Sequence, residues 1–85
     1  MSTYGAGRKV RHYVAVIALH GIDGEVRPLS IVWDDGKRFD VEVVARPRRQ
    51  RTITSGYALR HDVLVQGKRR TLWRDDVGWF VEVPP

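Results

Sequence analysis

The chain has 85 residues, no cysteine and a formal net charge of +5. A single domain of this length holds one compact core, and without cysteine it has no disulfide framework, thiol nucleophile or cysteine-based zinc site. The longest apolar run, residues 14–19, is too short to cross a bilayer, and the N-terminus carries no recognisable secretory signal. These features predict a cytoplasmic protein with no membrane partner.

The first strand is predicted at Val10–His20, after a disordered start at residues 1–9. β-Branched residues and the lack of Gly and Pro favour a strand, although apolar residues occupy both of its faces. The second face is therefore either covered by the rest of the domain at residues 10–85 or in contact with a partner chain.

The next two strands, residues 26–33 and 38–45, are predicted to form a hairpin around Gly36. A three-residue loop at 34–36 needs a residue in the left-handed region, which Gly adopts without a steric cost. This register sets three pairs on one face: Trp33 with Lys37, Ile31 with Phe39, and Leu29 with Val41. A slip of one residue would set core residues against acidic ones, so burial favours the first register.

The rest of the chain predicts further short strands. Residues 46–51 are predicted as a basic loop with at most one helical turn near 47–52, and residues 52–55 as a short strand. A type II′ turn at Gly67-Lys68 is predicted between strands 57–66 and 69–74. It sets Val63 opposite Leu72 and Arg60 opposite Asp75. A turn at 75–78 leads to a last strand at 79–83. The pattern predicts an all-β fold, a small antiparallel meander or barrel of five to six strands, SH3-like or similar.

Two motifs carry a resemblance to a known group. They are PLxIxWxDGxxFxV at residues 28–41 and DxxGWFVE at residues 75–82. Over roughly residues 26–83 the chain resembles small bacterial β-domain proteins of unknown function. The resemblance implies a small β-domain and no assigned activity. The arginine-rich segment at 46–51 departs from that pattern.

Basic residues gather between positions 46 and 74, where the only acid is Asp62. Arginine binds phosphate through two N–H groups at once, so this segment predicts nucleic-acid binding. The candidate residues are Arg46, Arg48, Arg49, Arg51, Arg60, Lys68, Arg69 and Arg70. The alternatives are a solvated charge run and an arginine-rich composition that reflects a GC-rich genome. The clusters at 46–51 and 68–70 lie at opposite ends of one predicted strand, on the order of 30 Å apart at about 3.3 Å per residue, so one shared groove is not implied.

Other side chains are better explained as structural. Core packing is favoured over base stacking or a cation cage for the aromatic residues Tyr57, Trp73, Trp79 and Phe80. No acid, base and nucleophile converge, and the histidines His12, His20 and His61 lack the spacing of a metal site. The sequence therefore predicts a binding module, not an enzyme, with no catalytic residue, metal or cofactor. Its predicted partner is nucleic acid; the alternative is a protein-interaction module or a homodimer through Val10–His20.

Overall fold

The computed structural model describes residues 8–85, and the disordered start predicted at residues 1–9 falls largely outside this range. Within these residues every regular element is a strand. The strands are β1 (Val10–His20), β2 (Val26–Val32), β3 (Arg38–Val43), β4 (Arg48–Arg51), β5 (Tyr57–Val65), β6 (Lys68–Arg74) and β7 (Trp79–Val83). No helix in residues 8–85 is long and apolar enough to span a membrane.

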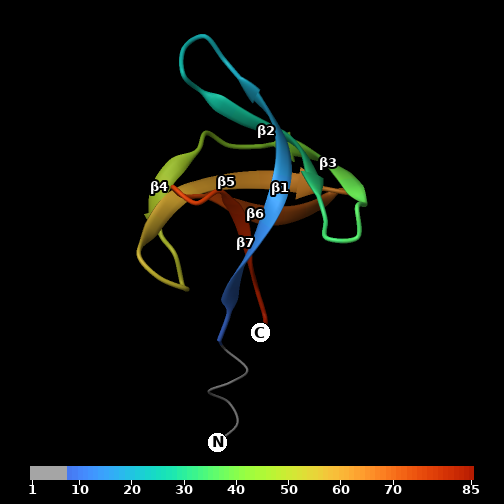
Figure 1. The fold of residues 1–85 in the computed structure, drawn as a ribbon. Helices are drawn as coiled ribbons and strands as arrows, with labels where there is room; N and C mark the ends of the chain where they lie inside the picture. Colours follow the sequence, from blue (N-terminus) through green and yellow to red (C-terminus); the bar gives the residue numbers. More distant parts are fainter. Residues whose placement is uncertain (1–7) are drawn as a thin grey trace, which may run out of the picture.

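The strands form an antiparallel barrel in the order β3-β2-β1-β7-β6-β5, which closes where β3 pairs with β5. Strand β4 is a seventh strand outside the closed ring. It pairs with the N-terminal half of β5, and β3 pairs with the C-terminal half. The predicted all-β fold and small barrel are confirmed. Strand β1 crosses the front of the barrel in Figure 1, and its hairpin with β2 projects beyond the barrel.

The hairpin of β2 and β3 has the predicted loop and register. Gly36 has a φ of 86°, in the left-handed region, and its N–H donates to the Trp33 carbonyl at 2.9 Å. The N–H of Trp33 in turn donates to the Lys37 carbonyl at 2.8 Å, and Ile31 pairs with Phe39. Turn chemistry and burial thus select one register, as expected.

The predicted pair of Leu29 with Val41 is wrong. The ladder between β1 and β2 shifts by one residue between Ile17 and Ala18, which leaves Leu29 outside the pairing and 41% exposed. A bulge of this kind bends its strand and interrupts the ladder. The ladder with β2 ends at Asp40, and Val41 pairs with Val65 of β5.

The turn between β5 and β6 is displaced from its predicted position. It uses Gln66 and Gly67, both at positive φ (52° and 76°), so Val65 pairs with Lys68. Two adjacent positive φ values are typical of a type I′ turn, in which Gly takes the second place. The register differs by two residues from the prediction and therefore keeps the same faces.

Two predicted cross-strand pairs fail for this reason. Val63 lies opposite Arg70 rather than Leu72, and Arg60 lies opposite Trp73 rather than Asp75. The predicted Arg60–Asp75 ion pair is therefore not formed.

The predicted basic loop at 46–51 is also wrong, because Arg48–Arg51 is strand β4. The short strand predicted at residues 52–55 is instead the turn that returns to β5, and no helical turn forms at 47–52. Thr52 closes this turn: its N–H donates to the Gly56 carbonyl at 2.8 Å, and its hydroxyl accepts from the N–H of Ser55 at 2.9 Å. Arginine is a poor strand signal, but charged side chains suit an exposed edge strand.

The apolar side chains form two clusters on opposite faces of the sheet. Ile31, Val63 and Leu72 fill the barrel, with partly buried valines and Trp79 against them. Ala58, Trp73 and Phe80 form the second cluster on the outer face. The turn at residues 52–56 covers this second cluster and is held there by Arg11, which donates to Thr54, Thr52 and the Ser55 carbonyl.

Candidate nucleic-acid interface

Two arginines of β4 stand on one face beside an exposed tyrosine of β5. Arg51 pairs with Tyr57, and Arg49 pairs with Leu59. Directly paired residues of antiparallel strands point to the same side. These four side chains therefore share one surface.

Both arginine heads lie close to the tyrosine ring. The guanidinium carbon of Arg49 is 5.6 Å from the centre of the Tyr57 ring, and that of Arg51 is 5.9 Å away. Both distances are within the range of a cation–π contact. Tyr57 is 55% exposed, and within residues 8–85 no carboxylate oxygen lies within 4.0 Å of either guanidinium. Neither cation is thus engaged by a carboxylate of these residues, and the contacts of the exposed ring are with the two guanidinium groups.

The same surface extends to β6. Leu59 pairs with Arg74, whose guanidinium carbon is 5.5 Å from the ring of Trp79. We call the surface formed by Arg49, Arg51, Tyr57, Leu59 and Arg74 the arginine–tyrosine platform. A shallow hollow of about 450 Å³ opens on it.

Two carboxylates border that hollow, Asp75 and Asp76. Asp75 is bound by Arg11 at 2.7 Å, and Asp76 is exposed. Asp76 is therefore the one carboxylate of this lining without an ion pair, beside Arg49 and Arg74, and the surface stays positive.

The exposure of Tyr57 follows from the length of β5. Residues of β5 alternate between faces, and Tyr57, Leu59, His61, Val63 and Val65 share one of them. Val63 is fully buried in the barrel, whereas Tyr57 and Leu59 lie on the half of β5 that pairs with β4, outside the closed ring. The same face that forms the core at one end of β5 is thus an open platform at the other.

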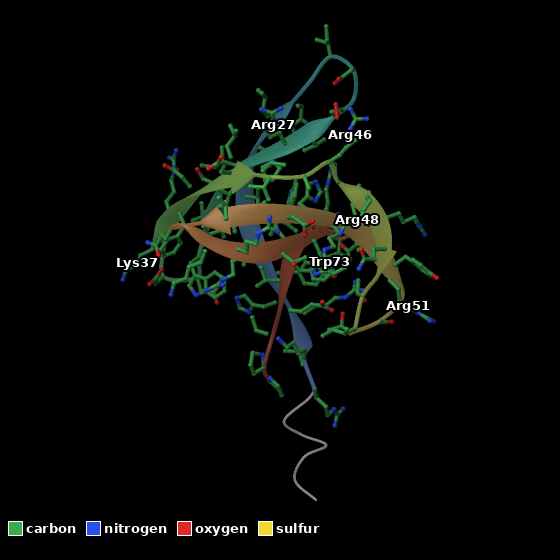
Figure 2. All side chains as sticks on the ribbon, turned by 180° about the vertical axis from the view of Figure 1, so that it is seen from behind. Arg27, Lys37, Arg46, Arg48, Arg51 and Trp73 are labelled. Carbon is green, nitrogen blue, oxygen red and sulfur yellow. The ribbon has the colours of Figure 1, made fainter. Side chains whose placement is uncertain are left out.

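Arg48 and Arg60 lie on the opposite face and share one carboxylate, Asp62. Arg48 Nη1 is 3.0 Å from Asp62 Oδ2, and Arg60 Nε is 2.9 Å from Asp62 Oδ1. The hydrogen bond from Arg60 holds the pKa of Asp62 below its ordinary value, with Arg48 adding to it against the opposing effect of burial. These two predicted site residues therefore act within the fold as one ion-pair network. Figure 2 shows Arg48 close to β5, with Arg51 farther along the segment.

The remaining candidates are separate from the platform. Lys68, Arg69 and Arg70 begin β6 at the far end of β5, since Lys68 pairs with Val65 while Arg51 pairs with Tyr57. Arg46 precedes β4 in the connection from β3. The structure thus divides the eight predicted residues among several places, and of these Arg49 and Arg51 lie within cation–π distance of an exposed tyrosine.

Sequence reasoning missed part of the platform. Trp73 and Phe80 are buried, as predicted for core aromatics, but Tyr57 is not. Arg74 belongs to the platform and was not among the predicted site residues. The usable signal is the position of Tyr57 directly after Ser55-Gly56, at the start of a strand longer than the barrel requires.

One histidine near this surface, His61, is buried. His61 is 2% exposed, its ring centre is 4.9 Å from that of Trp79, and its Nδ1 has no hydrogen-bond partner within residues 8–85. Burial lowers the pKa of His61 from its ordinary value of 6.5. The folded state therefore keeps this imidazole neutral where the unfolded chain binds a proton.

This environment predicts a pH dependence of stability. As the pH falls below about 6.5, the unfolded state takes up the proton first, so the free energy of unfolding should decrease until the folded-state pKa is reached. His61→Leu should lose less stability than the wild type between pH 7.5 and pH 5.5. His20→Gln removes an exposed imidazole and is the matched control. Urea unfolding at a series of pH values measures this, and equal slopes for the wild type and His61→Leu would contradict it.

Comparison of the chain with protein-family models, with curated proteins and with solved structures finds no match. The resemblance to small bacterial β-domains therefore stays a prediction.

Proposed function

We propose that the protein is a cytoplasmic binding module whose arginine–tyrosine platform binds single-stranded nucleic acid. A base would stack on the exposed ring of Tyr57, and Arg49, Arg51 and Arg74 would bind the flanking phosphates. The observation that carries the proposal is the exposed ring of Tyr57 within cation–π distance of two arginines that no carboxylate of residues 8–85 pairs, all on one strand pair. Aromatic rings and basic side chains on a sheet surface are the usual means of binding single strands without sequence preference.

The contact energies favour replacement of the cation–π contacts at Tyr57 by contacts with a ligand. An exposed cation–π contact contributes about 0.5–1 kcal/mol, whereas a base stacked on an aromatic side chain contributes about 1–3 kcal/mol. The guanidinium groups can rotate toward phosphates while the ring accepts a base. No buried ion pair has to be broken, because Arg48, Arg60 and Asp62 form their network on the other face.

The test is binding of a fluorescein-labelled twelve-nucleotide oligo(dT) or oligo(U), followed by fluorescence anisotropy at several salt concentrations. Three phosphate contacts predict a slope of about −2 in log K against log salt, at about 0.7 per phosphate on a single strand. Tyr57→Ala should weaken binding by roughly 5- to 150-fold, which corresponds to the loss of one stacked base.

A matched pair of double variants localises the binding. Arg49→Glu with Arg51→Glu should abolish measurable binding, whereas Arg69→Glu with Arg70→Glu changes the net charge equally and should weaken binding only slightly. Equal losses in the two double variants would show attraction by net charge alone. No binding of either oligonucleotide at low salt would rule the function out.

Self-association through β1 is a second candidate. The outer face of β1 exposes Tyr13 (40%), Ile17 (41%) and Leu19 (56%), while Val14 and Val16 on the inner face pack against the core. The hydroxyl of Tyr13 is bound to Asp75 at 2.6 Å, so Ile17 and Leu19 are the free apolar side chains on this face. Sedimentation equilibrium at high concentration decides this candidate, because a strict monomer would exclude it.

A further inference from the structure

Strands β6 and β7 share only a short ladder in the barrel. Their ladder consists of two pairs, Trp73 with Phe80 and Arg74 with Trp79. Beyond it β7 continues along β1 to Val83, while β6 continues along β5 to Lys68. The two strands diverge, and a cleft of about 730 Å³ lies between them.

The divergence leaves one edge of β6 without a strand partner. In the hairpin with β5, Val65 and Lys68 flank a two-residue turn. Main-chain hydrogen bonds alternate along an antiparallel pair, so the N–H and C=O groups of Arg69 and Thr71 point away from β5 and toward the cleft. The Arg69 carbonyl accepts a hydrogen bond from the side chain of its own neighbour, Arg70, at 2.9 Å. Such an edge is a template for an added strand.

Basic side chains line this cleft: Lys9, Arg60, Lys68, Arg69 and Arg70. The two acidic residues of the lining are already bonded. Asp62 is held by Arg48 and Arg60, and Glu82 accepts the N–H of Thr54 at 3.0 Å. Partly buried apolar side chains, among them Phe39, Val65 and Val81, lie between the basic ones. The cleft thus combines an open strand edge, apolar contacts and unbalanced positive charge.

We propose that this cleft binds an extended acidic segment of a partner protein, which adds as a strand to the free edge of β6. The main chain of the segment would bond to Arg69 and Thr71, as in other complexes formed by strand addition. Successive side chains of a strand point to opposite faces, so alternate residues would meet the apolar side chains and the basic rim. A nucleic acid would satisfy the charge, but it has no repeating N–H and C=O groups to pair with the strand edge. The proposal uses residues outside the arginine–tyrosine platform and does not depend on its function.

The test uses a labelled peptide of alternating glutamate and valine, capped at both ends and six residues long. Binding is followed by fluorescence anisotropy and by the amide NMR signals of the intact protein. We expect weak, salt-sensitive binding that moves the signals of residues 68–72 and 81–83. A second peptide with a central proline lacks a main-chain donor and should bind at least several-fold more weakly.

The two charge-reversed double variants act as reciprocal controls. Arg69→Glu with Arg70→Glu should weaken peptide binding by about tenfold or more, and Arg49→Glu with Arg51→Glu should leave it nearly unchanged. Circular dichroism shows whether each variant is folded. The proposal is overturned if the peptide moves no signal at millimolar concentration, if a lysine–valine peptide binds equally well, or if an oligonucleotide occupies this cleft instead.

Discussion

Replacement of Phe80 by alanine is expected to lower the free energy of unfolding by about 3–5 kcal/mol, the range for a buried phenylalanine. Phe80 is fully buried in the outer cluster with Ala58 and Trp73. A domain of this length has a total stability of roughly 4–13 kcal/mol at about 0.05–0.15 kcal/mol per residue. The variant should therefore lose a large part of its stability.

The contacts of the ring explain the size of this effect. The Phe80 ring centre is 5.3 Å from that of Tyr13 and 6.1 Å from that of Trp73, with the Trp73 ring nearly parallel. The guanidinium carbon of Arg11 lies 4.3 Å from the centre of the Phe80 ring. Arg11 also holds the turn at 52–56, so loss of the ring should loosen the cover of the whole cluster.

Urea unfolding followed by tryptophan fluorescence measures the loss. Val77→Ala is the matched control, because Val77 is 75% exposed in the adjacent turn and its truncation should change stability by no more than about 0.5 kcal/mol. A loss below about 1.5 kcal/mol for Phe80→Ala would contradict the buried position of the ring.

Asp75→Ala is expected to have the second largest effect, a loss of about 3 kcal/mol. The carboxylate accepts hydrogen bonds from Arg11 Nη1 at 2.7 Å, from the Tyr13 hydroxyl at 2.6 Å, and from the N–H groups of Val77 and Gly78 at 2.8 and 2.9 Å. It therefore joins the turn between β6 and β7 to the start of β1. Its removal takes this acceptor from Arg11 Nη1, from the Tyr13 hydroxyl and from two main-chain donors.

The pH dependence of this loss gives a further check. Burial alone would raise the pKa of Asp75, but the hydrogen bonds from Tyr13, Gly78 and Val77 and the charge of Arg11 outweigh it, so the pKa is lowered from 3.8. A lowered pKa contributes stability above the unfolded value, and this contribution is lost as the pH falls through the folded value.

The difference between the wild type and Asp75→Ala should accordingly shrink below about pH 3.8. Asp76→Ala, at an exposed neighbour, should change stability by no more than about 0.5 kcal/mol at any of these pH values. A difference that stays constant to the lowest pH would mean that the charge of Asp75 plays no part.

The parts of the fold that were predictable depend on local rules. Around Gly36 the turn residues and the apolar alternation agree on one register, and the observed pair of Ile31 with Phe39 follows from them. The β5–β6 turn has two acceptable positions, with Gly67 first or second. The observed turn requires a positive φ at Gln66, which is uncommon for a residue with a side chain. The local sequence alone therefore does not decide between the two positions of the turn.

The candidate site was predictable in composition but not in geometry. The local excess of arginine indicated the segment at 46–51. Its division into Arg49 on one face and Arg48 on the other requires the knowledge that this segment is a strand. Strand β4 is one half of a local hairpin with β5 across the turn at residues 52–56, and its run of arginines lacks the alternating apolar pattern that would predict a strand. The exposure of Tyr57 depends on the same hairpin, because Tyr57 lies on the half of β5 that pairs with β4 outside the closed ring.

The central claim is that the arginine–tyrosine platform is the surface that contacts a single strand. The most direct measurement is a map of the main-chain amide signals of ¹⁵N-labelled protein during titration with unlabelled oligo(dT). We expect the signals of residues 49–51 and 57–59 and of Arg74 to move together, with one common affinity. Movement confined to residues 68–72 and 81–83, or no movement at low salt, would contradict this account.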